Sequence, residues 1–351
     1  MSVNNEMLEK KMYKSKHYSQ QSGCKISSTN AKRTDIDVNI MRIIAAFFVA
    51  MIHVVGNSNS YLLTLNCISR FSVPIFIMVS GRYMLAKKHD NLSLIKKCGR
   101  LLFLMIIWSA IFYVYNSIRG QEPVIPFLSY LVAGPVHFWY IWAIIILYLM
   151  TPILFVFCEN SEQKIYRYAL VFTFIAGTFV TLLVRAGSIA VFSNIIERSK
   201  LPYQLGFVFC FLFGDYYRRY QPNISKSFGA ILFVGGTICT IISGFVITED
   251  LALSFFSPSA IIAAVGLYCT LSQLEYTDSA QTRNMVSNVA NCTLGIYLMH
   301  PLLIDPIESA IKIFMNSSSF YFYPLCTVIV FAFSFVLTFI IKHIPIIKSI
   351  V

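Results

Sequence analysis

Two residues that can do chemistry lie on one predicted apolar helix near the start of the chain. The segment NIMRIIAAFFVAMIHVV, residues 39–55, contains Arg42 and His53. At ~100° and ~1.5 Å per residue, their side chains lie within about 20° of one helix face and about 16 Å apart along the axis. Histidine exchanges protons near neutral pH, and arginine can hold an anion or a developing oxyanion. The pattern predicts a reaction or ligand site. The plainer alternative is an arginine that snorkels to an interface and a histidine that is hydrogen-bonded inside a bundle.

The composition indicates a polytopic helical membrane protein. Of 351 residues, 57% are hydrophobic and only 13% are charged, and the mean hydropathy is +0.67. Soluble domains contain about twice that charged fraction. The net charge of +12 is explained better by the positive-inside rule than by nucleic-acid binding, so no nucleic-acid partner is expected. The nine cysteines show no CxxC or Cys/His metal spacing, so no metal is expected.

An all-α bundle of about ten spans is predicted within residues 39–341. Residues 1–38 are expected to form a basic, disordered cytoplasmic tail, and residues 342–351 a short cytoplasmic tail. With the N-terminus inside, 21 of the 28 Lys and Arg residues fall in cytoplasmic segments and 5 in outer ones. This distribution predicts that both termini are cytoplasmic. The predicted spans are 39–57, 62–86, 101–118, 136–157, 168–186, 203–217, 227–248, 257–273, 287–305 and 320–341.

Depth along the predicted spans groups several polar residues in one outer layer. Arg70, in CISRFSVPIFIMVSG, lies at about the depth of His53. His137 and His300 also lie near the outer ends of their spans. Such a layer predicts a reaction or ligand site. In the plainer interpretation, His137 marks the membrane interface and His300, which precedes a proline, lies at a helix bend.

The inner side has a cluster of positive charge. Residues 81–102 contain six basic residues and one acidic residue, and Lys97 and Arg100 are spaced to point together from the start of a helix. Such clusters usually fix topology or contact anionic lipid, but this one is also suited to the phosphates of a cosubstrate. In the preceding span, Pro74 predicts a kink and Gly81 a close helix approach.

Four segments together resemble the acyltransferase type 3 family of integral membrane proteins. They are the Arg42-to-His53 spacing, SRFSVPIFIMVSG at 69–81, HFWYIWAIIILYLMTPIL at 137–154 and CTLGIYLMHPLL at 292–303. The resemblance extends from about residue 37 to residue 341. It is greatest to short bacterial sugar O-acetyltransferases, so no extra soluble domain is expected.

The resemblance implies a multi-pass protein of the bacterial cytoplasmic membrane that transfers an acyl group, usually acetyl, from acyl-CoA to a hydroxyl. The acceptor is expected to be a cell-surface glycan or its lipid-linked precursor. Catalytic roles are implied for His53, Arg42 and Arg70. His53 is expected to be a general base or a transient acyl carrier, and Arg70 to stabilise the oxyanion.

The remaining expected roles concern the two substrates. Acetyl-CoA is expected to bind through Arg42, Lys97 and Arg100. Lys97 departs from the family's usual Arg-x-x-Arg pair, and a lysine binds phosphate only as a point charge. The acceptor is expected to contact His137, Tyr297 and His300.

Other function classes fit a multi-span chain with charged residues in its interior. A carrier of small solutes or lipid-linked sugars and a polysaccharide export subunit are the alternatives. The absence of an obvious inverted repeat in the sequence makes a carrier less favoured. The sequence leaves open the acceptor sugar, the acyl group and the oligomeric state. Sugar specificity is expected in the outer loops 118–135 and 187–202.

Overall fold

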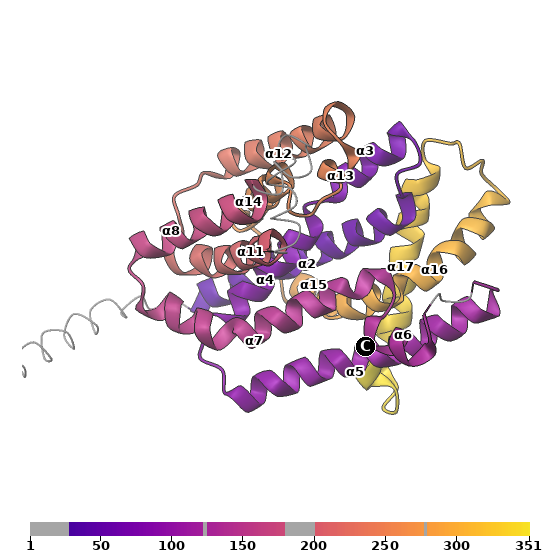
Figure 1. Ribbon diagram of the computed structural model, residues 1–351, viewed down its shortest axis with the longest axis horizontal. Helices are drawn as coiled ribbons and strands as arrows, with labels where there is room; N and C mark the ends of the chain where they lie inside the picture. Colours follow the sequence, from indigo (N-terminus) through magenta and orange to yellow (C-terminus); the bar gives the residue numbers. More distant parts are fainter. Residues whose placement is uncertain (1–27, 122–124, 180–200, 277–278) are drawn as a thin grey trace, which may run out of the picture.

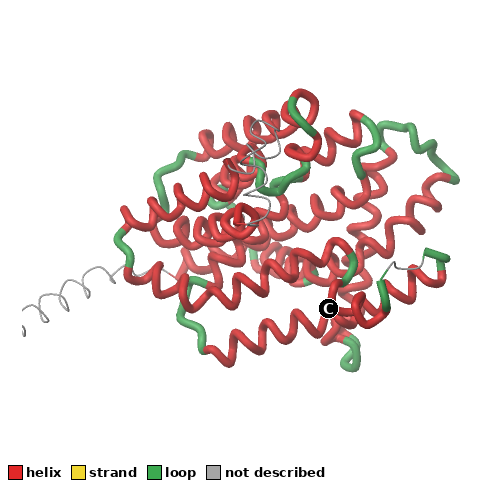
Figure 2. Tube along the Cα trace, viewed as in Figure 1, coloured by secondary structure: helices red, strands yellow, loops and turns green. Residues whose placement is uncertain are grey.

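The computed structural model describes residues 28–121, 125–179, 201–276 and 279–351. Within these ranges the chain forms helices joined by loops and turns, and it has no strand (Figure 2). The prediction of an all-α fold is therefore confirmed. Most of the predicted N-terminal tail, residues 1–27, and most of the predicted outer loop 187–202 lie outside the described residues.

The helices follow one another along the chain as Figure 1 labels them. They are α2 (Ser28–Val55), α3 (Ser60–Ser69), α4 (Ser72–Met84), α5 (Asn91–Ile118), α6 (Phe127–Ala133), η1 (Val136–Phe138), α7 (Trp139–Asn160), α8 (Gln163–Phe174), η2 (Ile175–Phe179), α11 (Leu201–Tyr220), α12 (Lys226–Val246), α13 (Glu249–Ala252), α14 (Pro258–Leu271), α15 (Ala280–Asn291), α16 (Thr293–Lys312), α17 (Phe322–His343) and η3 (Lys348–Ile350).

Six helical segments in the described ranges are long and apolar enough to cross a membrane: Ile36–Val55, Ser60–Met84, Asn91–Ile118, Val136–Asn160, Lys226–Val246 and Phe322–His343. Each overlaps a predicted span, although Asn91–Ile118 begins ten residues before the predicted span 101–118. The other four predicted spans overlap helices α8, α11, α14 and α16, which are shorter or less apolar, and residues 180–186 of one of them lie outside the described residues. The protein is therefore a multi-pass helical membrane protein, while the count of ten and the orientation stay predictions.

The second predicted span is two consecutive helices rather than one kinked helix. α3 ends at Ser69 and α4 begins at Ser72, so Arg70 lies at the interruption. Pro74 is in the first turn of α4, where a missing N–H costs least because the first N–H groups of a helix have no intrahelical partner. The prediction that Pro74 distorts this span is thus refined, since the break lies one turn earlier.

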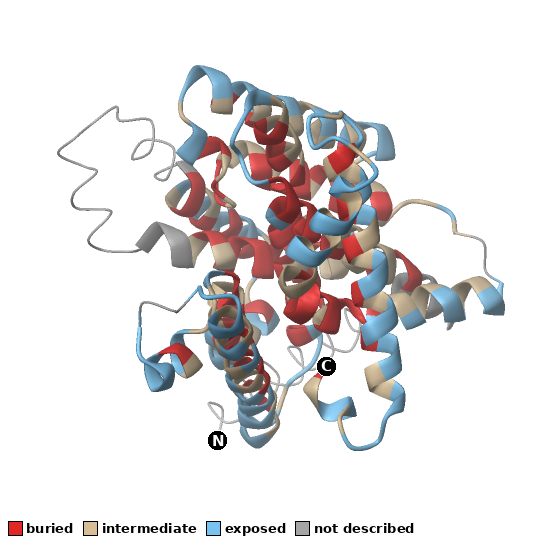
Figure 3. Cartoon of the chain, turned by 90° about the vertical axis from the view of Figure 1, so that its right-hand side faces the viewer, coloured by how far each residue is buried: buried red, intermediate tan, exposed pale blue. Residues whose placement is uncertain are grey.

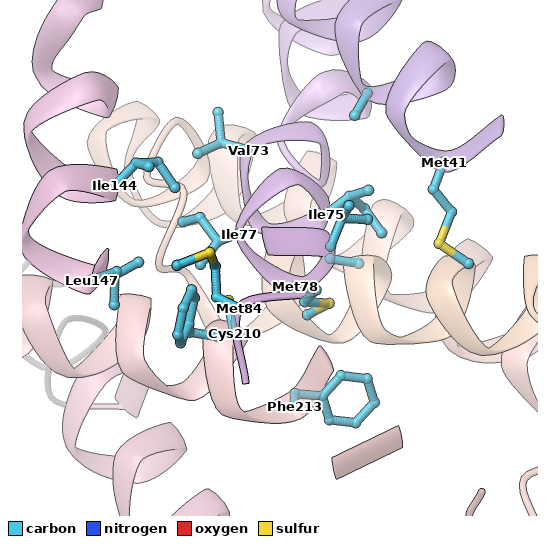
Figure 4. Packing of buried hydrophobic residues seen from close by; sticks show 14 of the residues in the cluster. Met41, Val73, Ile75, Ile77, Met78, Met84, Ile144, Leu147, Cys210 and Phe213 are labelled. Carbon is cyan, nitrogen blue, oxygen red and sulfur yellow. The ribbon is translucent and has the colours of Figure 1, made fainter. Parts of the chain in front are cut away.

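α4 lies at the centre of the bundle. In Ser60–Met84, 78% of the apolar window is buried, compared with 28% in each of α5, α12 and α17. The exposed side chains of those outer helices are largely apolar, as lipid contact requires, and the buried residues gather in the middle of the molecule (Figure 3). Figure 4 shows Val73, Ile77 and Met78 of α4 packed among apolar side chains of α2, α7 and α11.

Close packing around α4 depends on glycine. A Cβ added at Gly81 would overlap the backbone carbonyl of Phe211, and one added at Gly214 would overlap the carbonyl of Met78. The backbones of α4 and α11 therefore touch, as small residues at a membrane helix interface permit. This confirms the close approach predicted at Gly81.

The segment after α17 packs against α5. The indole Nε1 of Trp108 donates to the Ile350 carbonyl at 2.7 Å, and Val351 is only 2% exposed. Of the predicted tail at 342–351, the first two residues complete α17 and the others fold back on the bundle. That residues 342–351 lie on the cytoplasmic side stays a prediction.

Candidate active site

A cavity of about 330 Å³ lies between α2, α4, α7 and α16. No aspartate or glutamate is among its lining residues in the part of the chain that the structure describes. Proton transfer inside it would therefore depend on histidine or tyrosine. Of the residues predicted to form the site, the cavity is lined by Arg42, His53, Arg70, His137 and Tyr297, but not by Lys97, Arg100 or His300.

The face of α2 that was predicted to do chemistry is the face that lines the cavity. Arg42, Val49 and His53 all contribute to the lining, at the spacing of successive helical turns. Arg42 Nη2 donates to the Thr293 hydroxyl of α16 at 3.1 Å. Arg42 is thus half-buried and bonded within the bundle, which does not fit a side chain that snorkels away from it.

Three histidines from three separate helical segments meet beside the cavity. The ring centroid of His53 lies 5.7 Å from that of His137 and 5.1 Å from that of His300, and the last two are 5.9 Å apart. The predicted shared layer is thus a true cluster. His53 has an accessible ring although protein surrounds it, because the accessible side faces the cavity. Within the described ranges no group of His, Cys, Asp and Glu is arranged to hold a metal ion.

His300 and Tyr297, on the same helix, are placed differently from each other. His300 is fully buried outside the cavity lining, and its Nδ1 lies 2.9 Å from the Tyr297 carbonyl and 3.1 Å from the Ile296 carbonyl. Tyr297 lines the cavity, and its hydroxyl donates to the His137 backbone carbonyl at 2.5 Å. This bond ties α16 to η1, which contains His137 and directly precedes Trp139, the first residue of α7.

Arg70 is a buried cation at the same level. It is 7% exposed, its Nη2 donates to Asn66 one turn earlier, and its guanidinium lies 4.7 Å from the centroid of the Phe255 ring. It forms no ion pair with any described carboxylate, and its Nε has no hydrogen-bond partner. It is also within electrostatic reach of His53. A buried guanidinium with a free N–H is suited to a negatively charged oxygen that arrives with a substrate.

The predicted inner cations line a second hollow. A depression of about 440 Å³ at the start of α5 is lined by Lys96, Lys97 and Arg100 together with Asp90. Between α4 and α5, partial burial and then the positive charges of Lys97 and Lys87 lower the pKa of His89. The cations beside this hollow therefore make the local potential at His89 more positive, which favours an anion. Leu101, the neighbour of Arg100, lines the cavity that contains Arg42.

Lys342 is a further cation that the sequence pattern did not single out. Near the end of α17, it donates to the Asn291 carbonyl and is close enough to Arg42 and Arg100 to be repelled by both. None of these three cations forms an ion pair with a described Asp or Glu side chain. Arg100 Nη2 donates to the main-chain oxygen of Val351 at 3.4 Å. The sequence could have indicated Lys342 through its position. It directly follows the last predicted span, on the same predicted side of the membrane as Arg42 at the start of the first span.

The Arg42 end of the cavity also contains polar side chains that the sequence patterns did not single out. Ser80 of α4 lies near Tyr140 and Tyr148 of α7, and all three line the cavity. Tyr140 and Tyr148 are two turns apart in HFWYIWAIIILYLM, so one face of that helix carries both. This spacing was visible in the sequence, but a partner for the tyrosines was not.

Comparison with known proteins adds one finding. A protein-family model described as "Acyltransferase domain" matches residues 35–339. No curated protein and no solved structure matched the chain in the corresponding searches. The matched region contains every residue that lines the cavity, and the segments quoted above for their resemblance lie within it. Because the match covers most of the chain, this protein belongs to the acyltransferase type 3 family and is a membrane acyltransferase.

Proposed function

We propose that this acyltransferase moves an acyl group, most simply acetyl, from acyl-CoA to a sugar hydroxyl of a cell-surface glycan or its lipid-linked precursor in a bacterial cytoplasmic membrane. The observation that supports this most directly is that Arg42 and His53 line one cavity. Their predicted axial separation of about 16 Å gives a donor site and an acceptor site along a single helix face.

The size of the cavity favours a divided donor site. Ligand pockets typically measure ~300–1,000 Å³, and this cavity, at about 330 Å³, is at the lower limit. It suits the slender pantetheine arm of the donor and the reacting part of a sugar, but not the bulky nucleotide. The nucleotide phosphates would remain at the end of the bundle where Arg42, Arg100 and Lys342 lie within electrostatic reach of one another without Asp or Glu side-chain partners.

The proposed reaction takes place at the other end of the cavity, where His53 and Arg70 lie. His53 removes the proton of the acceptor hydroxyl as the hydroxyl oxygen attacks the thioester carbonyl. The resulting oxyanion accepts hydrogen bonds from Arg70, whose Nε is free to donate. When the C–S bond breaks, the ester remains on the sugar and the CoA thiolate recovers the proton from His53. Trp139 and His137 border the volume that the acceptor would fill.

The test is transfer of radiolabelled acetyl from acetyl-CoA to membranes of the producing strain by the purified protein. His53→Ala is expected to reduce turnover by about 100-fold or more, because a general base contributes ~10²–10⁴. His343→Ala, an exposed histidine away from the cavity, is the matched control and should leave turnover unchanged. Arg42→Ala should weaken acetyl-CoA binding.

Two results would contradict the proposal. One is wild-type turnover in His53→Ala. The other is a protein that moves a labelled sugar into vesicles with no acyl transfer, which would favour a carrier. Label retained on the protein after rapid quenching would indicate a transient acyl-His53 in place of direct attack.

A further inference from the structure

Three polar atoms in and beside the cavity are buried without a hydrogen-bond partner: Nε of Arg70, Nε2 of His137 and Nε2 of His300. Arg70 and His137 are lining residues of the cavity in which a substrate would bind. His300 is fully buried and lines no part of it. A buried polar atom without a partner costs about 1–3 kcal/mol. The free Nε2 of His300 therefore needs an explanation other than contact with the acceptor.

The tautomer of His300 is fixed by its own helix. The Tyr297 carbonyl would normally accept from the N–H of residue 301, but residue 301 is a proline and has none. His300 Nδ1 occupies that place, 2.9 Å from the Tyr297 carbonyl oxygen. A carbonyl oxygen only accepts, so Nδ1 carries the hydrogen. In the neutral ring, Nε2 then has a lone pair that can accept a hydrogen bond.

Of the rings that lie near His300 and can donate a hydrogen bond, that of His53 has the nearest centroid. Its ring centroid is 5.1 Å from that of His300, compared with 5.9 Å for His137. Two imidazoles joined by an N–H···N bond of about 2.9 Å have centroids roughly 5 Å apart. No described residue is hydrogen-bonded to the ring of His53, so this ring can turn toward His300 without losing a bond.

We propose that His300 is a positioning residue: its Nε2 accepts a hydrogen bond from one ring N–H of His53, which leaves the other ring nitrogen of His53 facing the cavity as the base. This inference depends on the proposed function of His53. A base held by a third group is a common arrangement in acyl transfer, where a carboxylate often takes that place. Here no carboxylate lines the cavity in the described part of the chain, and a neutral acceptor avoids burying a second charge.

The arrangement also provides for the proton during turnover. When the O–H bond of the acceptor breaks and His53 gains the proton, the imidazolium donates a charge-assisted hydrogen bond to His300. The proton returns to the CoA thiolate when the C–S bond breaks. His300 neither gains nor loses a proton during the catalytic cycle, and it contacts neither substrate.

Two conservative variants separate positioning from a purely structural role. In His300→Asn, the amide can still donate to the Tyr297 carbonyl, but no atom replaces Nε2. In His300→Gln, the amide oxygen can take the place of Nε2 as an acceptor. With radiolabelled acetyl-CoA and membranes of the producing strain, we expect kcat to fall about 100-fold in His300→Asn and no more than about 10-fold in His300→Gln. The acetyl-CoA Kd, measured by calorimetry, should be unchanged in both.

A double variant checks that His300 acts through His53. His300→Asn should add no further loss to His53→Ala, since coupled residues are not additive. Wild-type kcat in His300→Asn, an equal loss in both variants, or a multiplicative loss in the double variant would each overturn the inference. If the wild-type protein itself transfers no acetyl, the proposed function fails instead. If His300→Asn does not fold, kcat of His300→Gln is compared with that of wild type, and kcat of the double variant His300→Gln, His53→Ala with that of His53→Ala. A loss well above 10-fold in the first comparison, or an additional loss in the second, would overturn the inference.

Discussion

Val49 offers the sharpest test of the idea that the donor arm passes through the cavity. It lines the cavity on the same face of α2 as Arg42 and His53, and it is 5% exposed. Counted along the helix it lies about 10 Å from Arg42 and about 6 Å from His53. Val49→Phe would place an aromatic ring between the proposed donor entrance and the proposed base.

The size of the expected effect follows from these distances. A cavity of about 330 Å³ has little room for both a new ring and a substrate arm. Because a displacement of about 1 Å can cost ~100-fold in rate, a blocked path should lower kcat by at least that factor. The nucleotide of the donor binds outside the cavity in this proposal, so the acetyl-CoA Kd should change much less than kcat. Overpacking costs about 1–3 kcal/mol of stability, which a Tm measurement would reveal.

The assay compares Val49→Phe with Val234→Phe, the same chemical change at an α12 position that is 53% exposed. Both proteins are purified, and acetyl transfer, acetyl-CoA Kd and Tm are measured for each. Val234→Phe should behave as wild type. The reasoning is refuted if Val49→Phe is folded, binds acetyl-CoA and transfers acetyl as fast as Val234→Phe.

Further predictions concern the inner cations and the core. Arg100→Gln and Lys342→Gln should each weaken acetyl-CoA binding by roughly 10-fold at unchanged kcat, because a hydrogen bond to a charged group contributes ~1.5–3 kcal/mol. Calorimetry at several salt concentrations would measure this, with the exposed Lys88→Gln as control, and an unchanged Kd in both variants would contradict it. Gly214→Ala should lower Tm, because the new Cβ would meet the α4 backbone, whereas Gly235→Ala has open space and should not. Equal Tm values for the two glycine variants would argue against the tight contact of α4 with α11.

The sequence was most informative where one helix carries the whole pattern. Arg42 and His53 were predicted to share a face from their spacing alone, and both line the cavity. Depth counting also brought His137 and His300 to the level of His53, and the three rings do meet. Such predictions succeed because helix geometry is local and the bilayer restricts each span to a narrow range of tilt and depth.

Contacts between helices were less accessible to prediction. Lys342 is 300 residues away from Arg42 in the sequence, yet the two are within electrostatic reach. Lys97 and Arg100 were predicted to act with Arg42; the structure places both in the lining of a second hollow, and that they act together stays a prediction. Lateral arrangement depends on which faces pack together, and apolar spans carry little information about this because lipid and protein interiors are similarly apolar.

The sequence by itself determined that this chain is a helical membrane protein and that it resembles membrane acyltransferases, and it predicted that Arg42, His53 and Arg70 take part in its chemistry. These conclusions depend on composition, periodicity and short motifs, which are local properties of the chain. Only the tertiary structure decided that one cavity joins Arg42 to His53 and that His300 lies beside His53, fully buried and outside the cavity lining. The physical reason is that spacing fixes the face and depth of a side chain, while packing against neighbouring helices decides whether that face borders a cavity or a core.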